Sequence, residues 1–165
     1  MFNLFDFKNF NIGDNPFNIF ANIKVKKLND LAKIPTRGSE YAAGYDLYAA
    51  TADTIDIAPH STVKIGTGLS FELPKGTFAA IFARSGIATK RGLRPANCVG
   101  VCDSDYRGEY IIALHNDTDV VMSILAGERI AQMILLPYIE MKFEETNDLT
   151  ETERGTSGFG NSGRF

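Results

Sequence analysis

The 165-residue chain has no tryptophan, only two histidines and only two cysteines. Two cysteines cannot build the disulfide framework of a small secreted protein. Cys98 and Cys102 fall in one strand-like run, where residues four apart lie about 13 Å from each other. That is too far for a disulfide or for two ligands of one metal ion. We interpret both as small buried hydrophobic residues. His60 and His115 have no partner at metal-ligand spacing and are interpreted as structural or surface residues.

Long apolar runs are also missing. No stretch approaches the roughly 18 apolar residues that a membrane helix requires, so no membrane association is predicted. The first twenty residues contain one lysine and two aspartates. This composition is typical of neither a secretory signal nor an arginine-rich transit peptide. The predicted location is therefore the cytoplasm.

The formal net charge of −3 argues against general binding of nucleic acid. Acidic residues are absent from positions 73–102, where five cations occur, whereas positions 140–153 contain six acids and one lysine. A neutral-to-basic window inside an acidic protein is a place where a small polyanion could bind. A chance fluctuation on a solvated face explains the same window.

Short strand-like runs separated by glycine, proline, aspartate or asparagine make up the central part of the chain. They begin at Ile23 and include "STVKIGTGLSFELP", "GTFAAIFA" and "RIAQMILLPYI". Such runs predict an all-β barrel or sandwich, and "RSGIATKRG" is the one segment that could form a short helical turn. We therefore divide the chain into an extension of unknown role (1–22), a β domain (23–140) and a C-terminal arm (141–165).

Both ends of the chain leave alternatives open. Residues 1–22 hold six of the twelve phenylalanines and could be a leader or a hydrophobic docking element. The arm is polar and then glycine-rich, and it cannot bury enough apolar surface to join a core. It is either a flexible tail or, because Phe159 stands alone among glycines, a segment that closes over a flat ligand.

Two short stretches could do chemistry. In "VGVCDSDYRGEY" (99–110), Asp103 and Asp105 follow a strand-like run, so this stretch could be a plain turn or could present a reactive carboxylate. In "ARSGIATKRG" (83–92), Arg84, the Ser85 hydroxyl and backbone N–H groups beside Gly86 could donate to phosphate oxygens. A plain Ser-Gly turn fits that stretch equally well.

Five stretches in order resemble the five motifs of the trimeric dUTPase family, the deoxyuridine 5′-triphosphate nucleotidohydrolases. They are "AAGYDLYAA" (42–50), "ARSGIATKRG" (83–92), "NCVGVCDSDYRGEY" (97–110), "GERIAQMILLP" (127–137) and "RGTSGFGNSG" (154–163). The resemblance covers about residues 23–163. It implies a distorted jelly-roll-like β-barrel with a flexible C-terminal arm, and hydrolysis of dUTP to dUMP and pyrophosphate.

The resemblance also implies roles for residues of the third motif. Asp103 would activate the attacking water, and Tyr106 would lie under the deoxyribose, where a 2′-OH would not fit. Uracil contacts would come from Asn97 and from backbone around Val101 and Cys102. The family usually has isoleucine where this chain has Cys102.

Contacts to the triphosphate are implied for the second, fourth and fifth motifs. The implied residues are Arg84, Ser85, Gly86, Gln132, Arg154 and Gly160. Phe159 would stack on uracil, a contact worth about 1–3 kcal/mol. The family usually has proline where this chain has Ala83.

The resemblance further implies a homotrimer with shared active sites and Mg²⁺ as the cofactor, with no direct protein ligand. Asp46 of the first motif could contact the metal through water or could make only a structural hydrogen bond. Two rivals remain: a dCTP deaminase, whose catalytic glutamate would fall on Ala113, and a β-barrel that binds a nucleotide or a partner protein without turnover.

Overall fold

The structure is a computed structural model that describes residues 21–158. Within that range the chain forms twelve strands and one helix. The strands are β1 (Lys24–Lys27), β2 (Thr36–Arg37), β3 (Tyr45–Tyr48), β4 (Ile55–Ile57), β5 (Thr62–Gly66), β6 (Leu69–Glu72), β7 (Thr77–Phe82), β8 (Leu93–Pro95), β9 (Gly100–Asp103), β10 (Ile111–Asn116), β11 (Met122–Ile124) and β12 (Arg129–Pro137). The helix is α1 (Ser85–Arg91). The prediction of an all-β chain is confirmed.

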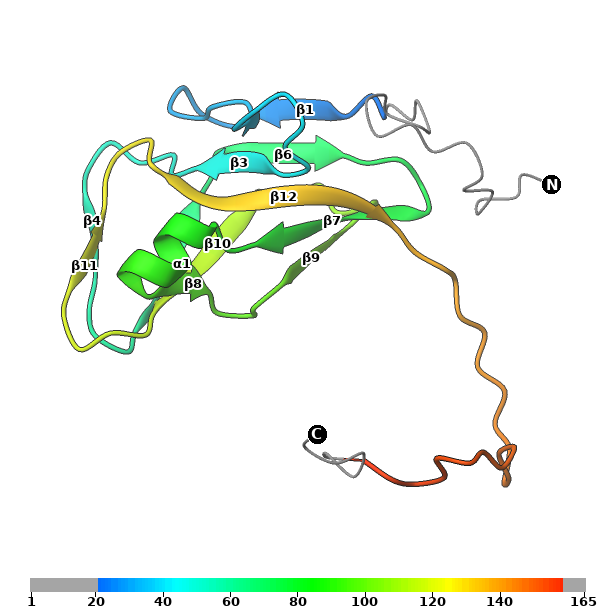
Figure 1. The fold of residues 1–165 in the computed structure, drawn as a ribbon. Coiled ribbons are helices and arrows are strands. Elements are labelled where there is room, and N and C mark those ends of the chain that lie inside the picture. The colour runs from blue at the N-terminus through cyan, green and yellow to red at the C-terminus, as the bar shows by residue number, and fades with distance from the viewer. Residues whose placement is uncertain (1–20, 159–165) are drawn as a thin grey trace.

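The strands pair antiparallel throughout and divide into four sheets (Figure 1). The largest sheet has the order β2-β3-β12-β7-β9, and a three-stranded sheet has the order β5-β10-β8. The pairs β1-β6 and β4-β11 complete the fold. In Figure 1 the β4-β11 pair lies at the opposite end of the molecule from the point where the C-terminal arm leaves β12.

The core is built from the inward-facing residues of strands along which buried and more exposed positions alternate. Along β10, Ile112, Leu114 and Asn116 are buried, and the residues between them are more exposed. This period of two is what a pleated strand with one buried face requires. Burying an aliphatic side chain of this size contributes about 1.5–3 kcal/mol, so each strand is held mainly by its inward face.

A buried amide joins β10 to the β4-β11 pair. The Asn116 side chain is fully buried, and its Nδ2 donates to the carbonyl oxygens of Ile57 at 3.0 Å and Val120 at 2.8 Å. Its Oδ1 accepts from the Thr118 backbone N–H at 3.0 Å. Because buried polar groups are costly when unpaired, this set of bonds fixes the β4-β11 end of the molecule onto the core.

Helix α1 follows β7 directly and confirms the short helix that "RSGIATKRG" predicted. It buries Ile87 and ends at Gly92, whose φ of 61° is left-handed. Glycine adopts this conformation without the steric cost that other residues meet. Among residues 21–158 there is no helix of the length and apolarity needed to cross a membrane.

The interpretation of Cys98 as a buried strand residue was wrong. Cys98 is exposed, has φ of 60°, and precedes β9 rather than lying in it. Its backbone N–H donates to the Pro95 carbonyl at 3.0 Å, so the chain reverses here before the strand begins. Cys102 does lie in β9 and is partly buried.

Candidate active site

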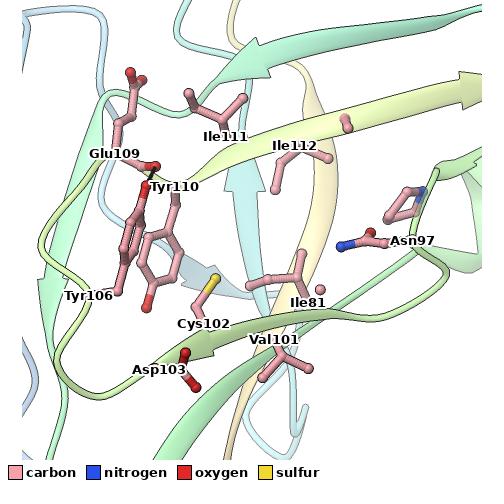
Figure 2. A pocket seen from close by; sticks show the side chains of 13 residues that line it. Ile81, Asn97, Val101, Cys102, Asp103, Tyr106, Glu109, Tyr110, Ile111 and Ile112 are labelled. Atoms are coloured by element: carbon pink, nitrogen blue, oxygen red, sulfur yellow. Dashed lines mark hydrogen bonds between the residues drawn. The ribbon is translucent and has the colours of Figure 1, made fainter.

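A pocket of about 290 Å³ lies along β9 and the first half of β10. It is lined by four of the predicted site residues on one segment, together with Tyr106 from the turn that follows (Figure 2). The four residues are Asn97, Val101, Cys102 and Asp103. The structure therefore brings together every residue that the third motif was predicted to contribute.

Asp103 is both the last residue of β9 and part of a turn. Its backbone lies opposite Phe78 of β7, its carbonyl accepts from the Tyr106 N–H at 3.2 Å, and its side chain is exposed. The strand fixes the backbone, and the turn leaves the carboxylate free to meet water and ligand. The two interpretations of this stretch, a turn and a reactive carboxylate, are thus compatible.

The Tyr106 ring is held over the pocket by its own turn. Its hydroxyl donates to the Glu109 carbonyl at 3.1 Å. Gly108 lies directly beneath the hydroxyl, and a Cβ at that position would overlap it. Tyr106 is 45% exposed, so part of this residue remains accessible to a ligand.

Glu109 and Tyr110 are pocket-lining residues that sequence reasoning missed. The Glu109 carboxylate accepts from the Gly68 N–H at 2.7 Å. Tyr110 is 2% exposed, and burial raises the pKa of its hydroxyl above the ordinary value. Burial also raises the pKa of the neighbouring Cys102 thiol, so this thiol stays protonated and a poor nucleophile at neutral pH. The Tyr110 and Cys102 side chains are therefore uncharged at neutral pH, and the carboxylates that line the pocket are those of Asp103 and Glu109.

A second group of predicted residues gathers around Asp46. The Asp46 carboxylate, 9% exposed, accepts from Arg84 Nε at 2.7 Å and lies 3.1 Å from Arg129 Nη1. Two guanidinium groups share one carboxylate, so the cluster has one net positive charge. Such a cluster attracts an anion, and arginine presents the donor geometry that phosphate oxygens accept. Arg129 had not been predicted as a site residue.

Gln132 lies in the same region. It is opposite Asp46 on β3 and opposite Phe82 on β7, and its Nε2 donates to the Ala83 carbonyl at 2.9 Å. That bond fixes the segment from which Arg84, Ser85 and Gly86 follow. Ser85 and Gly86 are exposed at the start of α1. The structure therefore places the second- and fourth-motif residues close together.

The two groups lie at opposite ends of β7. Asp103 is opposite Phe78, whereas Gln132 is opposite Phe82. Four residues along a strand correspond to about 13 Å. One chain therefore does not bring the Asp103 carboxylate and its own arginine cluster to the same end of this sheet.

The described part of the C-terminal arm does not cover the pocket. The Tyr138 N–H donates to the Gly76 carbonyl at 3.2 Å, and residues 139–158 are exposed. Figure 1 shows this part of the chain running away from the strands. Arg154 bonds within its own turn, from Nε to the Ser157 carbonyl at 3.0 Å. The predicted contacts of Phe159 and Gly160 lie outside the described residues.

No group of three or more histidine, cysteine, aspartate or glutamate side chains that could hold a metal ion occurs within residues 21–158. Both carboxylate oxygens of Asp46 are engaged by arginines. Of the two roles open for Asp46, this geometry favours the structural one.

The arrangement of strands places the chain in the class of jelly-roll-like, all-β proteins. Comparison with known proteins gives the family. A family model described as dUTPase matches residues 30–163, so the chain belongs to the dUTPase family. It is 46% identical over 143 residues to a deoxyuridine 5′-triphosphate nucleotidohydrolase of Yarrowia lipolytica, covering 86% of this chain and 88% of the relative. A relative of the same description from Desulfitobacterium hafniense is 45% identical over 146 residues, covering 86% and 97%.

Solved structures agree with this assignment. The dUTPase of Staphylococcus bacteriophage 80alpha with dUPNHPP superposes with a TM-score of 0.79 at 27% identity, covering 86% of this chain and 98% of that one. The expected jelly-roll-like fold is thus confirmed at the level of fold and family.

Proposed function

We propose that this chain hydrolyses dUTP to dUMP and pyrophosphate, with Asp103 activating the attacking water. The observation that supports this best is the exposed Asp103 carboxylate at the edge of the β9 pocket, beside the Tyr106 ring. Removal of dUTP limits uracil in DNA, and the product supplies dUMP for dTMP synthesis.

The pocket along β9 would hold the nucleoside. Asn97 and the backbone at Val101 and Cys102 offer N–H and C=O groups to the edge of uracil. Such groups discriminate uracil from cytosine, because O4 accepts a hydrogen bond where the cytosine amino group donates one. Tyr106 would pack under the sugar and leave no room for a 2′-OH.

The triphosphate would bind the cluster at the other end of β7. Arg84, the Ser85 hydroxyl, backbone at Gly86 and the Gln132 amide are the proposed donors. Asp46 holds Arg84 from behind and keeps its guanidinium oriented without cancelling the charge of the whole cluster, because Arg129 adds a second cation.

The hydrolysis step needs one proton acceptor. Asp103 would take a proton from water while the oxygen attacks the α-phosphorus, and the bond to the bridging oxygen of the leaving pyrophosphate would break. Arg84 and Arg154 would stabilise the negative charge on the leaving group. A positioned general base contributes about 10²–10⁴-fold to such a rate.

A complete site would need more than one chain. Asp103 and Gln132 lie opposite positions of β7 that are about 13 Å apart, and the described part of the arm runs away from the strands (Figure 1). Both observations support a homotrimer in which one subunit supplies the nucleoside pocket, a second supplies the arginine cluster, and an arm with Arg154, Phe159 and Gly160 closes over the ligand.

Mg²⁺ fits this arrangement as a cation held by triphosphate oxygens and water, since the described residues offer no cluster of metal ligands. When bound it would neutralise phosphate charge and help to orient the phosphate chain.

A pyrophosphate-release assay with dUTP and dCTP tests the proposal. We expect release from dUTP only, and its loss in Asp103→Asn. Ammonia release from dCTP would identify a deaminase. Tight nucleotide binding without any product from either substrate would identify a non-enzymatic binding protein, and the proposal would be withdrawn in both cases.

A further inference from the structure

Tyr110 is the one buried side chain within residues 21–158 whose polar atom has no hydrogen-bond partner. Its hydroxyl is inaccessible, although the residue lines the nucleoside pocket. The polar group beside this hydroxyl is the Cys102 thiol, and a thiol is only a weak hydrogen-bond partner. The hydroxyl is therefore weakly bonded at most, and phenylalanine would fill the same space, so the ring must be considered.

The Tyr110 ring lies in a row of three aromatic rings that ends at the pocket. Its centroid is 4.5 Å from that of Phe71 on β6 and 6.1 Å from that of Tyr106. Phe71 and Tyr110 are 4% and 2% exposed, whereas Tyr106 is 45% exposed. Figure 2 shows the Tyr106 and Tyr110 rings beside each other at one end of the pocket. The row thus runs from the core to the ligand side.

The backbone of Tyr110 is fixed on both sides. Its N–H donates to the Leu69 carbonyl at 2.8 Å, and its carbonyl accepts from the Thr67 N–H at 3.1 Å and from the Thr67 hydroxyl at 2.7 Å. Because this backbone is anchored and the residue is 2% exposed, the ring has little room to move and forms a wall behind Tyr106. The Tyr106 side chain itself is held by one hydroxyl bond and by the close approach of Gly108.

We propose that Tyr110 is a positioning residue for sugar selectivity, whose flat ring holds Tyr106 at the distance that excludes a 2′-OH. This inference rests on the proposed function, in which Tyr106 packs under the sugar. An aromatic pair contributes about 0.5–1.5 kcal/mol beyond its buried area. Loss of the ring should therefore narrow the preference for dUTP over UTP by roughly 2- to 10-fold.

The test compares kcat/KM for dUTP and UTP in three variants and the wild type, with melting temperatures for each. Tyr110→Met keeps the space filled with a flexible side chain but removes the flat ring. Tyr110→Phe keeps the ring and removes only the hydroxyl. Leu114→Ala is the control for lost core packing, because Leu114 lies four residues along and is fully buried but does not line the pocket.

We expect a narrowed dUTP/UTP ratio in Tyr110→Met, and a wild-type ratio in both Tyr110→Phe and Leu114→Ala. An unchanged ratio in Tyr110→Met, with both kcat/KM values lowered equally, would mean that the ring is only structural. A ratio narrowed equally in Tyr110→Phe would assign the effect to the hydroxyl. Either result overturns the proposal.

Tyr110→Leu replaces the methionine variant if that one does not fold, and failure of both would make the ring a core residue and end the proposal. Tyr106→Ala tests the proposed sugar contact of Tyr106 separately from the positioning role of Tyr110. If its ratio equals that of the wild type, Tyr106 does not contact the sugar and the proposed role of Tyr106 fails together with this inference. If Tyr106→Ala narrows the ratio and Tyr110→Met does not, only the inference about Tyr110 fails.

Discussion

Two inactive variants should restore each other's activity if a catalytic site draws on more than one chain. The first is Asp103→Asn, which keeps its arm but lacks the proposed base. The second lacks residues 153–165, so it keeps Asp103 but has no Arg154. Each parent is missing one part that the other still has, and refolding the two together would place both parts in mixed trimers.

The size of the effect follows from the symmetry. In a closed ring of three subunits each site would take its base from one chain and its arm from another. In an equal random mixture, half of the base-donating positions and half of the arm-donating positions are intact, so about one quarter of all sites are complete. We therefore expect about one quarter of the wild-type kcat per site from parents that have almost none.

The assay is pyrophosphate release after the parents are unfolded in guanidinium chloride and refolded at equal concentrations. A mixture of Asp103→Asn and Asp103→Ala is the matched control, since no arrangement of those two supplies a base. If each arm serves its own chain, no mixed trimer has a complete site and the rate stays at the parental background. That result, or the mass of a monomer in light scattering, would refute the shared site.

Three further changes test other parts of the structure. Asp103→Asn should lower kcat about 10²–10⁴-fold with an unchanged melting temperature; near-normal kcat would remove Asp103 as the base. Asp46→Ala should raise KM for dUTP and destabilise the fold by about 1–2 kcal/mol, because Arg84 and Arg129 lose their shared partner but remain partly exposed to water; an unchanged KM would separate this cluster from the triphosphate. Asn116→Ala should cost at least about 2 kcal/mol in urea unfolding, because buried carbonyls lose their donor; a neutral result would mean that water replaces the amide.

Local patterns in the sequence predicted local structure well. The run "STVKIGTGLSFELP" (61–74) predicted strands, and the structure forms β5 and β6 there. "RSGIATKRG" predicted a short helix, which ends at Gly92. These features depend on side-chain periodicity and backbone freedom over a few residues, so they can be predicted without knowing what packs against them.

Arg129 could not be found in this way, because an irregularity in β12 decides which way it faces. The pairing with β3 shifts between Arg129 and Ala131, so Arg129 lies opposite Tyr48 while Gln132 lies opposite Asp46. Residues three apart on a regular strand face opposite sides. The bulge instead brings Arg129 to the side of Gln132 and Asp46, which is how bulges re-aim side chains.

The separation of Asp103 from the arginine cluster also depends on which strands pair. In the sequence, the second and third motifs are adjacent, and one short segment, 93–96, divides them. In the structure, β9 runs antiparallel to β7 and carries Asp103 back toward the start of β7, while Arg84 follows the end of β7. A motif order alone cannot reveal this, because it depends on which strands become neighbours. The same strand pairing that builds the β9 pocket therefore places Asp103, the proposed base, away from the arginine cluster of its own chain. This separation is the reason for proposing that a neighbouring copy supplies the other half of the site.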